Sequence, residues 1–157
     1  MCIRDSHLIA VIDLDRFKLV NDTHGHAVGD ELLVLVAQGL QQIADDARCD
    51  ASTVVRQGGD EFLLSLHSSL PIDRSALGVR LDELRASRVS ISQGESLDLS
   101  FSYGVVAADG NPDMASLVRS ADLAAYEDKA HRRTGESVTD LRHPVDMHHS
   151  DVDRPAA

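Results

Sequence analysis

Acidic residues stand at the ends of two apolar segments of this sequence. Asp13 stands near the end of the run LIAVIDLD, and Asp60 with Glu61 stands at the entrance of FLLSL in VVRQGGDEFLLSL. Carboxylates at a strand entrance are half-buried, so they need a partner. Mg²⁺ is one such partner, because it binds hard oxygen ligands and bridges one or two carboxylates to substrate phosphates. If the two segments are neighbouring strands, three carboxylates converge and metal-assisted phosphoryl transfer becomes possible.

A hairpin turn is the simpler interpretation of the second segment. Gly58 and Gly59 permit positive φ, and Asp60 and Glu61 would keep such a turn in water. Solvated acids at strand ends are therefore the alternative to a metal site, and the spacing alone leaves both open.

Apolar periodicity predicts an α+β fold, an α/β sandwich with the element order β-α-α-β-β-α-β-α. LIAVIDLD is expected to be a strand buried on both faces, with Ile9, Val11, Asp13 and Asp15 on one side. VVR and FLLSL form a hairpin. Alternating apolar residues from Leu97 predict a further strand that runs to about residue 107. We expect a mixed, ferredoxin-like or palm-like sheet with the hairpin at its centre and helices packed on one or both faces.

Four helices are predicted between these strands. The first begins near Phe17 and stops at Gly25. The second and third cover residues 28–44 and 74–87. The last opens with Asn111 as N-cap and Pro112 at the first helical position.

Length and charge limit the classes of function. The chain has 157 residues, 43% of them apolar, which suits one packed domain. Its net charge of -11 argues against a nucleic-acid polymer or an anionic membrane as partner, but permits a small phosphorylated ligand together with divalent cations. No segment is apolar enough to cross a bilayer. Cys2 and Cys49 give no disulfide framework, so the cytoplasm is the expected location.

Longer motifs carry a specific resemblance. DLDRFKLVNDTHGHAVGDELL, followed by RQGGDEF, resembles the GGDEF family of diguanylate cyclases, and the later SYG and ADLAAYEDKAHRR extend the match over roughly residues 8–133. The resemblance implies an enzyme, a nucleotidyltransferase of bacterial signalling, that joins two GTP molecules into cyclic di-GMP and releases pyrophosphate. It also implies a homodimer, because two GGDEF domains, each holding one GTP, must face each other.

The resemblance assigns a metal site for Mg²⁺ or Mn²⁺. Asp13 matches the first metal-binding aspartate, with the backbone carbonyl of Leu14 as an adjacent ligand. Asp60 matches the second ligand and proposed proton acceptor, and Glu61 its acidic neighbour. Asp60 and Glu61 are the expected catalytic residues.

The resemblance also assigns GTP contacts. Asn21 and Asp30 match the pair that recognises guanine. Guanine has two adjacent N–H donors, and one carboxylate can accept both of them. Without the motif, Asp30 would be interpreted as a charge that complements a helix N-terminus. His26 is expected to shape the same loop, and His24 to face solvent. The expected phosphate contacts are Phe17, Lys18, Gly58, Gly59, Lys129 and Arg133.

Two positions depart from the family pattern. Many members carry an inhibitory product site, Arg-x-x-Asp, before the signature, and here Cys49 and Ser52 occupy its two matching positions. Arg48 and Asp50 lie nearby at the wrong spacing. We therefore predict no product inhibition through that site.

The ends of the chain carry further expectations. The family usually has a helix and an Asn-Arg turn before the first strand, whereas seven residues precede Leu8. We expect residues 1–135 to be an N-terminally truncated GGDEF domain, with residues 1–7 non-native or disordered and an upstream sensory domain missing. Residues 136–157 are expected to be a disordered polar tail, in which His143, His148 and His149 are solvated and bind no metal.

Two other functions stay open at this point. One is a catalytically silent GTP-binding regulatory module, and the other is a purely structural or interaction domain. The complete set of matched residues favours the enzyme.

Overall fold

The computed structural model describes residues 5–92 and 94–134. Its elements confirm the predicted alternation and add one short hairpin. In chain order they are β1 (Ser6–Leu14), α1 (Phe17–His24), α2 (His26–Asp46), β2 (Ala51–Gly58), β3 (Glu61–Ser68), α3 (Arg74–Arg85), β4 (Arg88–Ser90), β5 (Ser96–Asp98), β6 (Phe101–Asp109) and α4 (Met114–Thr134).

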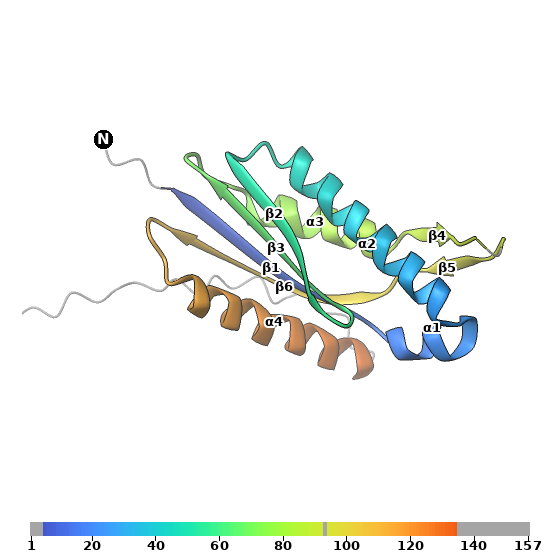
Figure 1. Cartoon of the computed structure of the whole chain (residues 1–157). Helices are drawn as coiled ribbons and strands as arrows, with labels where there is room; N and C mark the ends of the chain where they lie inside the picture. Colours follow the sequence, from blue (N-terminus) through green and yellow to red (C-terminus); the bar gives the residue numbers. More distant parts are fainter. Residues whose placement is uncertain (1–4, 93, 135–157) are drawn as a thin grey trace, which may run out of the picture.

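The main sheet has the strand order β2-β3-β1-β6 (Figure 1). This order confirms the α+β, ferredoxin-like expectation. The expectation of a mixed sheet is wrong, because β1 pairs antiparallel with both β3 and β6, and β2 pairs antiparallel with β3. β1 and β2 do run in the same direction, but β3 lies between them. The hairpin consequently occupies one side of the sheet, with β2 as an edge strand.

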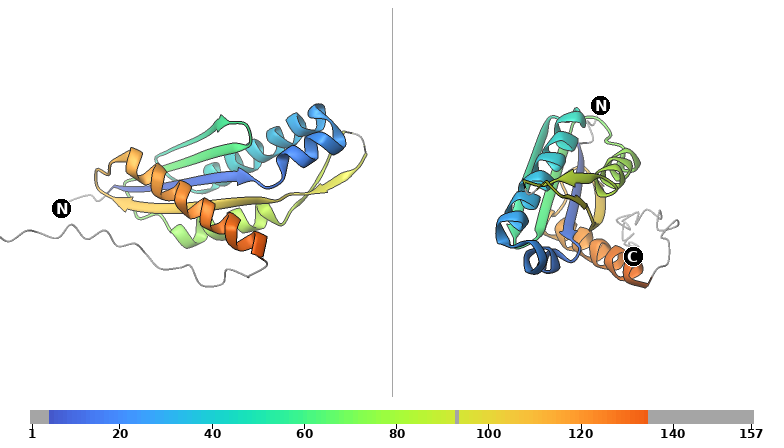
Figure 2. Two further views of the ribbon diagram at one scale, coloured as in Figure 1. Left: turned by 90° about the horizontal axis from the view of Figure 1, so that it is seen from below. Right: turned by 90° about the vertical axis from the view of Figure 1, so that its right-hand side faces the viewer.

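Helices cover both faces of the sheet. α2 and α3 pack on one face, and α4 packs on the other; the left view of Figure 2 shows α4 crossing in front of β6 and β1. β1 alternates between the two cores, as its sequence predicts: Leu8, Ala10 and Ile12 join the α2 side, whereas Ile9 and Val11 join α4. Its carboxyl end therefore emerges between two packed layers.

Gly104, in the SYG motif, allows α4 to lie directly on β6. A Cβ at this position would lie 2.1 Å from the carbonyl oxygen of Ala121 and 2.5 Å from the backbone nitrogen of Ala125. Real Cβ atoms do not approach backbone that closely, so any side chain here would push α4 away. The glycine therefore sets the height of α4, and with it the position of the residues on the last turns of α4.

The strand expected from Leu97 to residue 107 is wrong as one element. Ser96–Asp98 pairs with Arg88–Ser90 in a separate two-stranded ribbon, and β6 begins only at Phe101. Between them the backbone N–H of Leu99 donates to the carbonyl of Ser87, which takes this residue out of both ladders.

The N-terminus of α4 also differs from the prediction. Asp113, not Asn111, caps the helix, since its carboxylate accepts hydrogen bonds from the backbone N–H groups of Ala115 and Ser116 at 3.3 and 3.2 Å. The Ser116 hydroxyl also donates to this carboxylate, and that hydrogen bond lowers the pKa of Asp113. The helix consequently starts at Met114.

Near the N-terminus, Ser6 and His7 belong to β1 and pair with Ser68 and His67. These two positions are therefore ordered, and the expectation that residues 1–7 are non-native or disordered stays a prediction for the rest of the segment. Residues 1–4 and the expected tail, 136–157, lie outside the described residues. Within the described part of the chain, every helix is too short or too polar to span a bilayer.

Candidate active site

The ends of β1 and β3 bring two of the predicted acids together. Asp13 and Glu61 are direct partners in the β1–β3 register, which confirms that these strands are neighbours. The backbone N–H of Leu14 donates to the carbonyl of Asp60 at 3.1 Å, so the turn of the β2–β3 hairpin is fastened to the end of β1. Side chains of directly opposed residues lie close enough to interact.

Lys129 of α4 reaches the same place. Its Nζ lies 2.7 Å from Oδ1 of Asp13, and the two side chains are 23% and 24% exposed. The pair borders a hollow of about 290 Å³ between α4 and the sheet. Arg133, one turn further along α4, is exposed.

The three carboxylates do not form a ready-made metal cluster. Among residues 5–92 and 94–134, no group of three or more His, Cys, Asp or Glu side chains is placed to hold an ion. Asp13 and Glu61 nevertheless offer hard oxygen donors side by side, and the Lys129 ammonium is the charge that balances Asp13 in this structure. Such a pair fits Mg²⁺, which commonly takes one or two carboxylates and completes its shell with water and substrate phosphates.

The hairpin turn is shaped by Gly59 and Arg56. Gly59 has φ +50, a conformation that L side chains rarely adopt, and a Cβ on Gly58 or Gly59 would meet no described atom within 4 Å. The carbonyl of Gly59 accepts two hydrogen bonds from Arg56, from Nε at 3.0 Å and from Nη2 at 2.8 Å. Sequence reasoning missed Arg56, because the register shift between Arg56 and Gly58 becomes visible only in the strand pairing of the structure.

A second hollow, of about 310 Å³, lies between α2 and the hairpin. Asp30 stands at its exposed rim, and Arg56 and Phe62 line it from the hairpin side. The remaining lining residues are apolar: Leu33, Val34, Ala37 and Val54. An apolar slot with one carboxylate at its rim suits a flat ring that carries N–H donors.

Gly29 brings Asn21 close to Asp30. A Cβ on Gly29 would lie 1.8 Å from Oδ1 of Asn21 and 3.3 Å from the ring of Phe17, so α1 rests directly on the first turns of α2. Phe17 is half-buried against the core, and Lys18 is exposed. Of the predicted substrate residues, Asn21 and Asp30 are therefore on adjoining surfaces.

The two histidines of this region differ from expectation in one respect. His26 is exposed at the start of α2. His24 does not face solvent: it is half-buried, and its Nδ1 lies 3.4 Å from Oε2 of Glu95.

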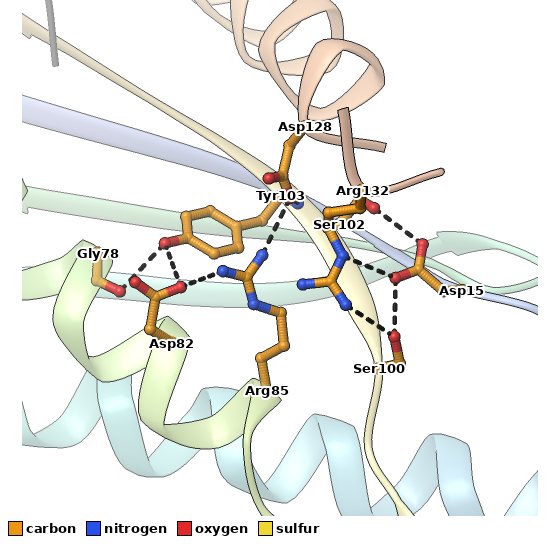
Figure 3. A network of polar contacts seen from close by, with 9 residues as sticks. All are labelled: Asp15, Gly78, Asp82, Arg85, Ser100, Ser102, Tyr103, Asp128 and Arg132. Carbon is orange, nitrogen blue, oxygen red and sulfur yellow. Dashed lines mark hydrogen bonds and ion pairs between the residues drawn. The ribbon is translucent and has the colours of Figure 1, made fainter. Parts of the chain in front are cut away.

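Two polar networks beside the site involve residues that the sequence did not predict (Figure 3). In one, Asp15 at the end of β1 binds Ser100, Ser102 and Arg132. The other network joins α3, β6 and α4, and its members are Gly78, Asp82, Arg85, Tyr103 and Asp128. Burial and the hydrogen bond to Asp82 raise the pKa of Tyr103. The SYG and ADLAAYEDKAHRR motifs contain four of these nine residues, Ser102, Tyr103, Asp128 and Arg132, but their partners come from distant segments.

The positions matching the inhibitory product site lie at the start of β2. Cys49 is half-buried and its Sγ contacts the carbonyl of Ala51 at 3.3 Å, while Ser52 is exposed. The absence of product inhibition stays a prediction.

Known proteins resemble this chain in sequence. The family model described as "Diguanylate cyclase, GGDEF domain" matches residues 3–135. Diguanylate cyclase DosC of Escherichia coli (strain K12) is 36% identical over 120 residues, which cover 75% of this chain and 25% of that protein. The bifunctional diguanylate cyclase/cyclic di-GMP phosphodiesterase MucR of Pseudomonas aeruginosa is 37% identical over 136 residues, 85% of this chain and 19% of that protein. The chain thus spans about a quarter or less of the length of these relatives.

Solved structures resemble it as well. The GGDEF domain of DgcB from Caulobacter crescentus, in complex with c-di-GMP, has a TM-score of 0.67 at 26% identity, with 84% of this chain and 75% of that one covered. The active GGEEF domain of a diguanylate cyclase from Vibrio cholerae has a TM-score of 0.66 at 28% identity, covering 80% and 78%. SiaD from Pseudomonas aeruginosa, solved with its activator SiaC, has a TM-score of 0.68 at 30% identity, covering 83% and 47%.

Proposed function

This chain belongs to the GGDEF family of diguanylate cyclases, and from that premise we propose that it condenses two GTP molecules into cyclic di-GMP and two pyrophosphates. One observation carries the proposal. Asp13 and Glu61 oppose each other beside the glycine turn, with Lys129 paired to Asp13, while Asp30 borders a separate hollow on the other side of the hairpin. A triphosphate and a base would occupy these two places.

Guanine would lie in the hollow between α2 and the hairpin. Asp30 accepts the two adjacent N–H donors of the guanine edge, and Asn21 contacts the same edge. Adenine offers an acceptor there, so Asp30 disfavours ATP. The apolar lining of the hollow, with Phe62 and Leu33, excludes water from the ring faces.

The triphosphate would run from this hollow across Gly58 and Gly59 to the end of β1. Phosphate oxygens can approach the turn because neither glycine carries a side chain. Lys18, Lys129 and Arg133 would neutralise their charge, and the backbone N–H groups of Phe17 and Lys18, at the start of α1, would donate to phosphate oxygens. Lys129 would exchange Asp13 for a phosphate oxygen as the nucleotide enters.

The donor set at the strand ends fits Mg²⁺ or Mn²⁺. Asp13, Asp60, Glu61 and the carbonyl of Leu14 would hold the ion, which supplies charge neutralisation on the triphosphate. Asp60 takes the proton from the attacking 3′-hydroxyl. Each attack forms one P–O bond at an α-phosphate and breaks the bond to the departing pyrophosphate.

The proposed reaction needs two domains. Each GTP is both attacking and attacked, so a second copy must present its nucleotide opposite the first, and positioning supplies most of the acceleration. Two relatives support a larger context: MucR is named as bifunctional, and SiaD was solved with an activator. We place this domain in the bacterial cytoplasm, as part of a longer protein with a sensory segment.

Product analysis tests the proposal. The chain, fused to a dimeric coiled coil, is incubated with Mg²⁺ and GTP or ATP, and the nucleotides are identified by mass spectrometry. We expect cyclic di-GMP from GTP and no product from ATP. Asp60→Ala should lower the rate at least a hundredfold, because it removes a metal ligand and the proton acceptor.

Tight GTP binding without product would contradict the cyclase and favour the catalytically silent module. A folded chain that does not bind GTP would contradict both the cyclase and the silent module, and would favour an interaction domain.

A further inference from the structure

Asp15 has no part in the proposed reaction, although it stands two residues after Asp13. Its side chain is 16% exposed. Oδ1 accepts a hydrogen bond from the Ser102 hydroxyl at 2.8 Å and Oδ2 one from the Ser100 hydroxyl at 2.9 Å (Figure 3). Nε of Arg132 lies 3.5 Å from Oδ2. Each oxygen of this carboxylate already accepts a hydroxyl hydrogen, and the Arg132 guanidinium faces one of them. All the partners of the Asp15 side chain are therefore other residues of the protein, and it is not placed to bind substrate.

The backbone around Asp15 is fixed on both sides. The N–H of Asp15 donates to the carbonyl of Ser100 at 2.9 Å, and the N–H of Leu14 donates to the carbonyl of Asp60 at 3.1 Å. Two consecutive amides thus tie the end of β1 to the segment before β6 on one side and to the hairpin turn on the other. Asp13 and the carbonyl of Leu14 lie within this fastened stretch.

Arg132 extends the arrangement to α4. Its Nη2 donates to the Ser100 hydroxyl at 3.0 Å while Nε faces Asp15. Lys129, three residues earlier and so on the same side of the helix, reaches Asp13. α4 therefore contacts the end of β1 at two acids, and the Asp15 contact helps to fix where the Lys129 ammonium lies.

We propose that Asp15 is a positioning residue, which with Ser102 and Arg132 holds Asp13, the Leu14 carbonyl and Lys129 where they receive a metal-bound triphosphate. The inference rests on the proposed function. Outer partners that orient metal ligands commonly change metal affinity by about 10- to 100-fold when mutated. If the network only closed the end of the sheet, mutating it would change the stability of the fold and leave the metal affinity unchanged.

Asp15→Asn is the informative variant. Asparagine has the same size and can still accept one hydroxyl hydrogen, but it loses the charge that faces Arg132. Tyr103→Phe is the matched control, since Tyr103 is the next residue after Ser102 on β6. Its hydroxyl contacts α3 instead, at the Gly78 carbonyl and Asp82, at 3.2 and 2.9 Å.

Binding without turnover gives the readout. Mn²⁺ is titrated into the full chain together with 3′-deoxy-GTP, which lacks the attacking hydroxyl. The protein is kept in excess, so that little free nucleotide is left to chelate the metal, and free Mn²⁺ is measured by electron paramagnetic resonance. We expect Asp15→Asn to weaken Mn²⁺ binding about tenfold. Tyr103→Phe should leave the Mn²⁺ affinity unchanged even where it lowers the melting temperature.

The inference is overturned if Asp15→Asn binds Mn²⁺ as tightly as the wild type. Should this variant fail to fold, Arg132→Gln decides in its place, because Arg132 is on the surface: weaker Mn²⁺ binding supports the inference, and an unchanged affinity overturns it. A wild-type chain that binds neither Mn²⁺ nor 3′-deoxy-GTP contradicts the proposed function itself, whereas wild-type binding with unaffected variants contradicts the inference alone.

Discussion

In the proposed function, Asp30 selects the base that the nucleotide site accepts. Its carboxylate lies at the rim of the hollow between α2 and the hairpin, where one acid can accept both N–H donors of guanine. A hydrogen bond to a charged group contributes about 1.5–3 kcal/mol, less where water competes, as at this exposed rim.

Asp30→Ala should therefore weaken binding of 3′-deoxy-GTP by about 10- to 100-fold and leave the weak binding of ATP unchanged. Isothermal titration with both nucleotides measures the two affinities. Asp45→Ala is the matched control, because Asp45 is exposed on the same helix and its carboxylate contacts Gln41. Equal losses in the two variants would contradict the guanine assignment.

A second prediction at the scale of single residues concerns product inhibition at Cys49 and Ser52. Neither side chain can provide the charged pair of an Arg-x-x-Asp site, so the rate of product formation should be insensitive to added cyclic di-GMP in the micromolar range. Steady-state rates with and without added product measure this. Inhibition that disappears in Arg48→Ala would show that the neighbouring arginine serves the site after all.

Sequence reasoning reached some site residues and missed others for a common reason. That Asp13 and Glu61 lie together could be predicted because each stands at the end of an apolar run that is typical of a strand. Arg56, Ser100 and Arg132 could not, since each acts through a contact with a distant segment or with a backbone carbonyl. No local pattern carries that information.

At the scale of the elements, the height of α4 above β6 matters most, because α4 carries Lys129. Gly104 permits this packing. Gly104→Ala should lower the free energy of unfolding by about 3 kcal/mol, the upper end for overpacking, since rigid backbone and not a flexible side chain stands in the way.

A loss of that size corresponds to a melting temperature lower by about 10 °C in a domain of this length. Thermal denaturation followed by circular dichroism measures it. Gly78→Ala is the control: its Cβ would lie 3.8 Å from the Tyr103 hydroxyl, and alanine is the better helix former. Similar melting temperatures for the two variants would contradict the close-packing argument.

The predicted elements failed where two local signals competed. Leu97, Leu99 and Phe101 alternate as one strand would, but the hydrogen bond from Leu99 to Ser87 divides them between two sheets. Asn111 and Asp113 are both acceptable helix caps. Asp113 caps the helix, because its carboxylate accepts a hydrogen bond from the backbone N–H of Ser116. The alternation of β1, which no competing signal disturbs, was predicted residue by residue.

At the scale of the whole molecule, the proposed reaction requires two copies. The unfused chain should show a rate per domain that rises with protein concentration, because the productive species is a dimer. Fusion to a dimeric coiled coil should make the rate per domain independent of concentration. Initial rates over a hundredfold dilution series measure both. Light scattering shows at which dilutions the unfused chain is a monomer. If its rate per domain stays constant through those dilutions, the reaction needs no partner and the proposal is contradicted.

Stoichiometry tests the central claim most directly. Cyclic di-GMP and pyrophosphate are quantified in one reaction of the fused chain with GTP and Mg²⁺. The proposed condensation predicts two pyrophosphates for each cyclic di-GMP, with no free GMP. Pyrophosphate released without the cyclic dinucleotide, or GTP bound and recovered unchanged, would contradict it.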